Sequence, residues 1–251
     1  AKDAEQVINS RCQETGSPLY KISRTEVENI SYGWDGQTFT DLKTGLTLQT
    51  SLLGLFQPMN AAMAARACLA LELADADAVR QGIAFARWPA RLELLRQDPP
   101  VLLDGAHNPQ GCTALAAALH RLLPGQPVIF LTGMLRDKDY RTMLRIVLDQ
   151  PIYRPTAVFC VRPDSPRALP APELAAEAGK IMSQLHNPLK SGYNVMDTIH
   201  VNDSPAEGAR QALQLAAQTG TALCAFGSLY MVGSIRGILR VREARLWTGK
   251  G

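Results

Sequence analysis

The segment Val101–Asn108, with the sequence VLLDGAHN, decides the fold that we expect for this chain. Its first three residues are apolar, as in a buried strand, and Asp104 and Gly105 end that strand. Pro109 then opens a helix, and Asn108 before it is a favoured N-cap residue, so the two form a matched helix start. A buried strand that leads directly into a helix is the repeating unit of a parallel α/β sheet.

The same alternation of apolar strands and helical segments continues to the end of the chain. We expect strands over residues 91–95, 101–103, 128–132, 157–161, 193–196 and 222–226, and helices over 109–123, 140–148, 172–184, 205–219 and 231–240. The pattern predicts an α/β fold with a Rossmann-like, mostly parallel sheet and helices on both faces. Ligands of such sheets bind beyond the carboxyl ends of the strands.

The residues before Trp88-Pro89 follow a different pattern. We expect a helix over 5–14, strands over 19–23, 30–34, 38–41 and 47–51, an Ala-rich buried helix over 60–72 and a further helix over 77–86. The Asp35-Gly36 pair predicts a hairpin between the second and third of these strands. Because Pro89 cannot continue a helix, we expect a boundary between two units near residue 88.

Composition limits the classes of function that the chain can have. Apolar residues make up 46% of the 251 residues and charged residues 20%, and the net charge is +3. Basic and acidic residues are interleaved, whereas a nucleic-acid surface clusters its basic residues. No apolar run approaches the ~18 residues of a membrane span. The five cysteines are far apart and form no CxxC, so we expect reduced thiols in a cytoplasmic protein and no metal site. From the charge pattern and the short apolar runs we expect neither nucleic-acid nor membrane partners.

The turn after residue 103 places three polar side chains beside a helix N-terminus. Asp104 can accept hydrogen bonds from ribose hydroxyls, His107 can meet a carboxylate or a phosphate, and the helix N-terminus favours anions. The same residues also fit a plain strand–turn–helix with Asn108 as its cap and an incidental His107. The residues alone leave both interpretations open.

The segment DGAHNP at 104–109 resembles the DxAHNP motif of the Mur ligase superfamily. Further segments resemble its folylpolyglutamate/dihydrofolate synthase branch: QPMNAA at 57–62, WPARLE at 88–93, GMLRDKD at 133–139, SPRAL at 165–169, and FGSLYMVG at 226–233 followed by Arg236. The last two discriminate this branch from the peptidoglycan Mur ligases, which usually carry Lys-Gly-Ser near the corresponding place. Together the motifs cover essentially the whole chain.

Two features depart from the family pattern. Ala90 stands where the family usually has Gly, and if that position needs a positive φ, Ala costs about 1 kcal/mol. The phosphate-binding loop GxxxxGK[ST] is absent from the sequence, and with it the expected magnesium ligands and main pterin contacts. We therefore interpret residues 1–88 as the incomplete C-terminal part of a central ATPase domain, and residues 89–251 as a Mur ligase C-terminal domain on the glutamate and ATP side.

The resemblance implies nucleotide-binding roles for four residues. It places Asn60 near the adenine and Arg91 at the ATP phosphates, a task that suits the planar fork of an arginine. It assigns Asp104 to the ribose. It places His107, the catalytic candidate, near ATP and the incoming glutamate.

The resemblance also offers three candidate glutamate contacts. They are Asn108, Ser228 and Tyr230, the last two at the start of the final helix. Capping alone explains Asn108 equally well, and a helix cap is the stronger alternative for Ser228 and Tyr230. Lys138-Asp139 is more typical of a solvated helix start than of a functional pair.

The resemblance implies an ATP-dependent ligase that adds L-glutamate to a folate. The product would be tetrahydrofolylpolyglutamate, or dihydrofolate where the acceptor is dihydropteroate, or both. ATP would phosphorylate the terminal carboxylate, the glutamate amine would attack the acyl phosphate, and Mg²⁺ would neutralise the transferring phosphoryl group. Without its phosphate-binding loop we expect the chain to be inactive alone, and we expect a monomer. Two alternatives stay open: another Mur-type amino-acid ligase, and a non-catalytic nucleotide-binding remnant or fragment that requires a partner.

Overall fold

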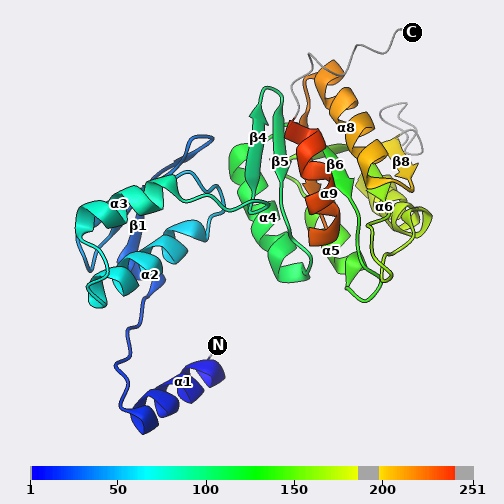
Figure 1. The fold of residues 1–251 in the computed structure, drawn as a ribbon. Helices are drawn as coiled ribbons and strands as arrows, with labels where there is room; N and C mark the ends of the chain where they lie inside the picture. Colours follow the sequence, from blue (N-terminus) through cyan, green and yellow to red (C-terminus); the bar gives the residue numbers. More distant parts are fainter. Residues whose placement is uncertain (1, 186–197, 241–251) are drawn as a thin grey trace.

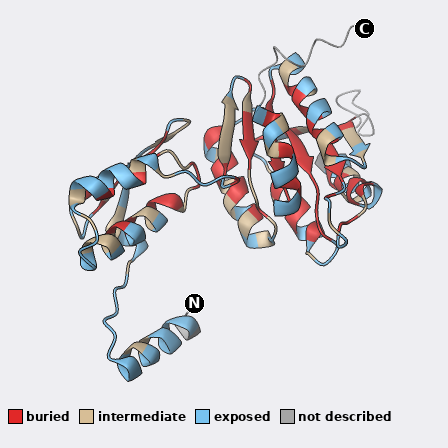
Figure 2. Cartoon of the chain, in the orientation of Figure 1, coloured by how far each residue is buried: buried red, intermediate tan, exposed pale blue. Residues whose placement is uncertain are grey.

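The computed structural model of the chain describes residues 2–185 and 198–240. Two sheets organise these residues, one with three strands and one with six. Figure 1 shows the smaller sheet, with its helices, to one side of the larger one. Helix α1 stands away from both, and Figure 2 shows it exposed along its length, whereas buried residues concentrate in the larger sheet and the helices against it.

The smaller part precedes residue 87. Its elements are α1 (Lys2–Thr15), the short 3-10 helix η1 (Arg24–Glu26), β1 (Val27–Gly33), β2 (Gly36–Asp41), β3 (Leu46–Thr50), α2 (Gln57–Ala70) and α3 (Ala76–Phe85). Strands β1, β2 and β3 form an antiparallel meander, so the predicted hairpin at Asp35-Gly36 is confirmed. Gly36 has a φ of 117°, a conformation that glycine adopts most readily. Leu46, Leu48 and Thr50 of β3 point inward in alternation, and α2 and α3 pack on that side.

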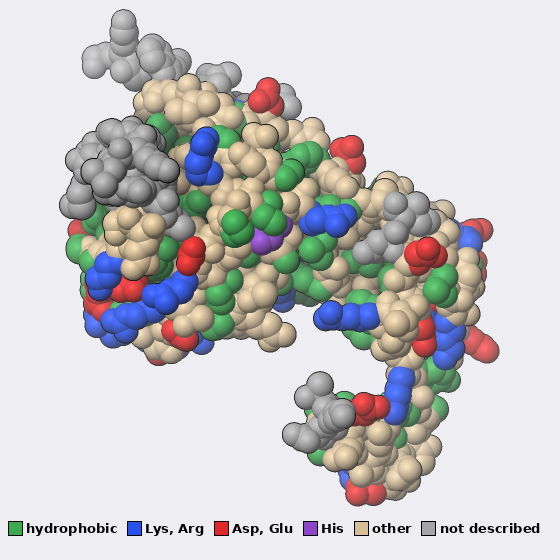
Figure 3. All heavy atoms as spheres, turned by 180° about the vertical axis from the view of Figure 1, so that it is seen from behind, with side chains coloured by type: hydrophobic (Ala, Val, Ile, Leu, Met, Phe, Trp, Pro, Cys, Tyr) green, Lys and Arg blue, Asp and Glu red, His purple; other side chains and the backbone are tan. Residues whose placement is uncertain are grey.

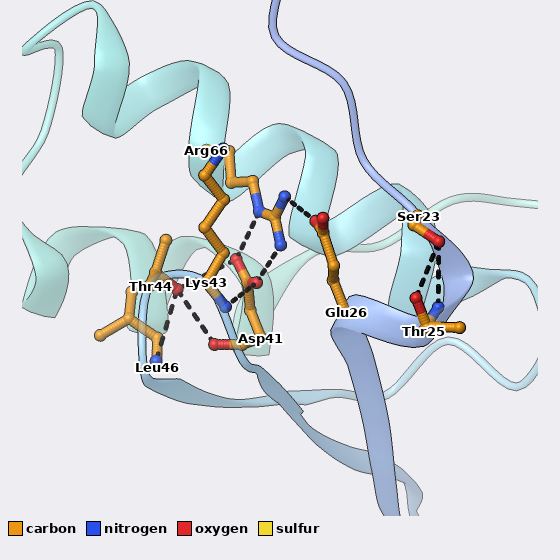
Figure 4. Close-up of polar contacts among 8 residues, drawn as sticks. All are labelled: Ser23, Thr25, Glu26, Asp41, Lys43, Thr44, Leu46 and Arg66. Carbon is orange, nitrogen blue, oxygen red and sulfur yellow. Dashed lines mark hydrogen bonds and ion pairs between the residues drawn. The ribbon is translucent and has the colours of Figure 1, made fainter.

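A buried ion cluster ties α2 to this sheet (Figure 4). Arg66 of α2 donates from Nε to Oδ2 of Asp41 at 2.9 Å and also contacts Oδ1 of Asp41 and Oε2 of Glu26. The Arg66 side chain is 10% exposed and that of Asp41 is fully buried. Hydrogen bonding to Arg66 holds the pKa of both carboxyl groups below their usual range, against the opposing effect of burial. Losing Arg66 would therefore leave the charge of the fully buried Asp41 without compensation.

The larger part follows the segment at residues 87–92. Its elements are β4 (Glu93–Gln97), β5 (Pro100–Leu103), α4 (Pro109–Leu122), β6 (Pro127–Thr132), α5 (Tyr140–Leu148), β7 (Arg154–Val161), α6 (Ala171–Leu185), β8 (Ile199–Asn202), α8 (Pro205–Thr219), β9 (Ala222–Phe226) and α9 (Leu229–Arg240). The strand order is β4-β5-β9-β6-β7-β8. Only β4 at the edge is antiparallel to its neighbour among these described strands.

Helices cover both faces of this sheet. One apolar cluster joins the sheet to α4, α5 and α6, and a second joins its other face to α8 and α9. The central strands are buried throughout, because each face is covered by helices. The predicted α/β fold with a mostly parallel sheet is confirmed.

Contacts cross the predicted boundary near residue 88. Leu53 belongs to the core cluster that fills one face of the larger sheet, and Tyr32, Trp34 and Leu55 pack against the same cluster. The Arg121 guanidinium of α4 lies 5.8 Å from the ring centroid of Tyr32. The division into residues 1–88 and 89–251 stays a prediction.

Several element predictions are wrong in detail. Residues 19–23 form no strand, and Tyr20 is 65% exposed, because no sheet edge lies against this segment in the described chain. The Ala-rich helix begins at Gln57 rather than 60, and Met63 is 47% exposed instead of buried, because the sheet and α3 cover only one side of α2. The strand expected from residue 91 begins at Glu93. Ala90 and Leu92, the residues on either side of Arg91, have left-handed backbones, which a strand cannot include.

The region before α8 differs from the prediction in a similar way. The strand expected at 193–196 lies outside the described residues, and β8 at Ile199–Asn202 was missed. His200 lies on β8 and stacks on Phe159 with ring centroids 4.2 Å apart. Four residues of mixed polarity give too short a pattern for sequence periodicity to detect.

Candidate functional site

Asp104 lies at the carboxyl end of β5 and is held by backbone amides on both sides. Its Oδ2 accepts the N–H of Leu92 at 2.7 Å, and its Oδ1 accepts the N–H of Ala106 at 2.8 Å. Burial raises the pKa of this carboxyl group, and the two amide hydrogen bonds and the nearby Arg91 oppose that rise. The side chain is therefore fixed in one orientation at the edge of the sheet.

His107 and Asn108 follow on the turn into α4. Nδ1 of His107 lies 2.8 Å from the carbonyl oxygen of Gly105, and because a carbonyl only accepts, Nδ1 carries the proton. Nε2 is then the ring nitrogen able to take up a proton. Oδ1 of Asn108 accepts the N–H of Gly111 at 2.7 Å, so the predicted N-cap is confirmed and this oxygen is committed to the helix.

Gly105 lacks a side chain at a point where other segments approach the backbone closely. A Cβ added at this position would lie 2.4 Å from Cδ2 of Leu229 and 3.3 Å from the carbonyl oxygen of Ala90. The glycine therefore lets the start of α9 and the segment before β4 approach the turn after β5.

Arg91 lies on a strained segment opposite this turn. Ala90 has a φ of 59° and Leu92 a φ of 49°, so the position where the family usually has Gly does adopt a positive φ. Arg91 itself is exposed, between two buried neighbours. Its guanidinium is one of the charges that oppose the rise in the pKa of Asp104.

Two hollows meet at Arg91. The smaller, of ≈ 70 Å³, is lined by Arg91, Asp104, His107 and Asn108 together with apolar residues. The larger, of ≈ 670 Å³, runs between α2 and α3 and is lined by Arg91, Asn60 and mostly small apolar side chains. That volume is within the range of small-molecule sites. Asn60 is exposed and donates from Nδ2 to Oε1 of Gln57 at 3.2 Å.

Neither Ser228 nor Tyr230 lines either of these hollows. Ser228 is buried, and its Oγ accepts the N–H of Tyr230 at 3.2 Å, which is the capping geometry at the start of α9. Tyr230 is 54% exposed, and its hydroxyl, together with Asp137, raises the pKa of Arg167. Leu229 between them contacts the Gly105 turn.

Basic side chains of the neighbouring loops are paired with acidic ones. Arg167 donates to Asp137 at 2.8 Å, and Arg136 lies 3.4 Å from Glu173. The face of the molecule in Figure 3 likewise shows Lys and Arg side chains beside Asp and Glu side chains. Asp139 caps α5 by accepting the N–H of Thr142 at 3.2 Å, as expected for a solvated helix start.

Within residues 2–185 and 198–240, no three His, Cys, Asp or Glu side chains come together as a metal site. In the same residues, no helix combines the length and the apolar character that crossing a membrane requires.

Three residues around the site were not predicted to belong to it. Glu93 and Arg236 pair across the start of the larger sheet, and Phe56 lines both hollows. Glu93 ends the segment WPARLE and Arg236 follows the segment FGSLYMVG, so both lie in family motifs. The motifs do not indicate that the two side chains meet. Phe56 lies just before the segment at residues 57–62, and nothing in the sequence singles it out.

The fold and this turn belong to a known class of protein. Residues 90–229 match the family "Mur ligase, glutamate ligase domain". Since this stretch is more than half of the chain, the chain belongs to the Mur ligase family.

Its relatives include folate ligases, as the motifs predicted. The folylpolyglutamate synthase of Lacticaseibacillus casei is 29% identical over 245 residues, which are 93% of this chain and 51% of that protein. The fold matches Mycobacterium tuberculosis folylpolyglutamate synthase complexed with ADP and AMPPCP with a TM-score of 0.74 at 24% identity, over 95% of this chain and 53% of that one. It also matches E. coli FolC in complex with DHPP and ADP with a TM-score of 0.67 at 25% identity, over 93% and 50%. The chain thus spans about half the length of these proteins.

Proposed function

We propose that this chain is the glutamate-ligase part of an ATP-dependent ligase that adds L-glutamate to a folate. The observation that carries the proposal is the turn after β5, where Asp104 and His107 are held beside the N-terminus of α4 and share a hollow with Arg91. A carboxylate, an imidazole, a guanidinium and a helix N-terminus suit a ribose and an anion together. The Lacticaseibacillus casei relative supports a folate over a peptidoglycan precursor as the acceptor.

The residues present fit a nucleotide. The cleft between α2 and α3 offers an apolar lining for a planar base, with Asn60 at its rim, and Arg91 connects it to the polar hollow. Arg91 would bind phosphate oxygens through its planar fork. Asp104 would accept from the ribose only with lone pairs that Leu92 and Ala106 leave free.

ATP would supply the phosphoryl group that activates the folate carboxylate as an acyl phosphate. The glutamate amine would then form a C–N bond to that carbonyl carbon, the C–O bond to phosphate would break, and phosphate would leave. His107 would take the proton lost by the amine at Nε2, because Nδ1 is committed to Gly105. Magnesium would neutralise the phosphoryl charge, with ligands outside this part of the protein.

A second candidate is a nucleotide-binding chain that needs further polypeptide for catalysis. Exposed large apolar side chains concentrate before residue 89 in the described chain: Val7, Ile8, Leu19, Tyr20, Leu42, Met63, Leu71, Leu73, Phe85 and Trp88. This concentration of exposed apolar side chains in one part of the protein supports contact of that part with further polypeptide. We further propose that residues 1–88 are part of a central ATPase domain and that the chain alone is an inactive monomer.

The test is phosphate release that depends on ATP, L-glutamate and tetrahydrofolate together. We expect none from the chain alone, and release after adding the N-terminal half of the Lacticaseibacillus casei enzyme in trans. Asp104→Ala should abolish that release, whereas Asp77→Ala on the exposed face of α3 should not. Release that survives Asp104→Ala would contradict the site, and failure of both the chain and the mixture to bind nucleotide would contradict the proposed function.

A further inference from the structure

The segment that carries Arg91 is strained. Ala90 and Leu92 both have left-handed backbones, with φ values of 59° and 49°, and neither is glycine. Such a backbone costs about 1 kcal/mol per residue. Strain of this kind persists only where surrounding contacts determine the conformation, and it gathers at functional sites.

Two of those contacts come from the turn after β5. The carbonyl oxygen of Ala90 accepts the N–H of Gly105 at 2.7 Å, and Oδ2 of Asp104 accepts the N–H of Leu92 at 2.7 Å. Both residues that flank Arg91 are therefore bonded to the turn that carries Asp104. These bonds set the distance between the Arg91 backbone and that carboxylate.

The third contact comes from the other side of the segment, through an ion pair. Oε2 of Glu93 accepts the N–H of Ala90 at 3.1 Å. Arg236 of α9 holds Glu93 in a bidentate geometry, with Nε 2.8 Å from Oε2 and Nη2 2.6 Å from Oε1. The two side chains are 31% and 20% exposed. Burial would raise the pKa of Glu93, but bonding to Arg236 and to Ala90 lowers it overall, so the pair is ionised at neutral pH.

Helix α9 connects this pair to the other end of the site. It begins at Leu229, between Ser228 and Tyr230, and carries Arg236 two turns later, where it packs beside β4 and β5 (Figure 1). The same rigid element therefore contacts the Gly105 turn with its first residue and Glu93 with its second turn.

We infer that Glu93 and Arg236 are positioning residues, which hold the strained segment so that Arg91 faces the nucleotide phosphates. Neither acts on the substrate; both act through Arg91. The inference rests on the proposed function in one respect, namely that Arg91 binds phosphate. The competing explanation is that the pair only packs α9 against β4.

A double-mutant cycle on nucleotide affinity separates the two explanations. With AMPPNP as the probe in isothermal titration of the whole chain, Arg91→Met and Arg236→Met should each weaken binding about tenfold. The double variant should be no weaker than Arg91→Met, because the pair acts only through that residue. Arg236→Lys keeps the charge without the bidentate fork, so its AMPPNP affinity should lie between those of the unmutated chain and Arg236→Met. Losses that multiply in the double variant would overturn the inference.

Amide hydrogen exchange gives a second measurement that does not need a nucleotide. Glu93→Gln keeps the shape of the side chain and weakens the pair, and Arg236→Met removes it. Both should speed exchange at the amides of Ala90, Leu92 and Gly105, while the buried amides of β6 stay protected. Unchanged exchange at Ala90 and Leu92 would overturn the inference.

The matched control is Arg210→Met on α8. Arg210 forms an exposed pair with Glu207 at 3.3 Å, far from the strained segment in sequence, and should change neither readout. If the unmutated chain binds no AMPPNP either alone or mixed with the added N-terminal half, the proposed function fails, and the exchange measurement still decides whether the pair holds the segment.

Discussion

The carboxylate of Asp104 and the backbone amide of Leu92 are 2.7 Å apart, and they join the carboxyl end of β5 to a residue in a left-handed conformation. The second oxygen of Asp104 is bonded to Ala106, so each oxygen already accepts one N–H. An acid at this position is therefore part of the scaffold of the site as well as a candidate ribose contact.

Replacing Asp104 by Asn should show both roles. An amide has a single acceptor oxygen, so one of the two backbone N–H groups loses its partner, and the free energy of unfolding should fall by about 1–3 kcal/mol. Binding of AMPPNP should be lost at the same time. Urea denaturation and isothermal titration measure the two effects, with Asp77→Asn as the control, and unchanged nucleotide affinity would remove Asp104 from the site.

Ala90→Gly should stabilise the chain. The φ of 59° costs an alanine more than a glycine, and we expect a gain of about 0.5–1 kcal/mol in the free energy of unfolding. The matched control is Ala64→Gly, at an exposed position inside α2, which should lose about 1 kcal/mol. If both variants lost the same free energy of unfolding, Ala90 would not have a left-handed backbone.

Gly227→Ala should be strongly destabilising. Gly227 has a φ of 122°, and an added Cβ would lie 2.7 Å from the carbonyl oxygen of Gly133 and 2.9 Å from Oγ1 of Thr132. We expect a loss of about 2 kcal/mol or more, measured by thermal or urea unfolding. Gly179→Ala inside α6, where a Cβ meets nothing within 4 Å, should be neutral or slightly stabilising. A mild effect at both positions would contradict the close approach of β6 and β9 at their carboxyl ends.

The Arg66 cluster should make stability depend on pH. The folded pKa values of Asp41 and Glu26 are lowered, so their contribution is fully present above the unfolded values of about 4 and is lost as the pH falls through the lower folded values. Arg66→Met should lower the free energy of unfolding at neutral pH by about 2 kcal/mol, because Asp41 is left buried with its charge. It should also flatten the acid dependence measured by denaturation between about pH 5 and pH 3. Arg80→Met, which breaks an exposed pair on α3, should do neither.

Local chemistry in the sequence predicted those parts of the structure that depend on neighbouring residues. The buried strand at Val101–Leu103, the cap at Asn108, the hairpin at Gly36 and the conditional strain at Ala90 all follow from the properties of a few consecutive residues.

Features that depend on residues far apart in the sequence were not predicted. Glu93 and Arg236 are separated by 143 positions, and no local pattern states that they meet. The Arg66 cluster draws its members from three different elements in the same way. Residues 19–23 looked like a strand because Leu19, Tyr20 and Ile22 are apolar, yet a strand forms only where a partner strand is present. The binding and catalytic roles of the site residues are predictions, and the variants above test those of Arg91 and Asp104. The site residues are Asn60, Arg91, Asp104, His107, Asn108, Ser228 and Tyr230.

Helix α9 has a consequence for how this protein can vary in length. Its first turn meets Gly105 and its second presents Arg236 to Glu93, and consecutive helical residues are rotated by 100°. One residue inserted between Leu229 and Arg236 would turn the guanidinium away from its partner while leaving the helix intact. The number of residues between Leu229 and Arg236 is therefore fixed by two contacts at once, one with the turn after β5 and one with the first residue of β4.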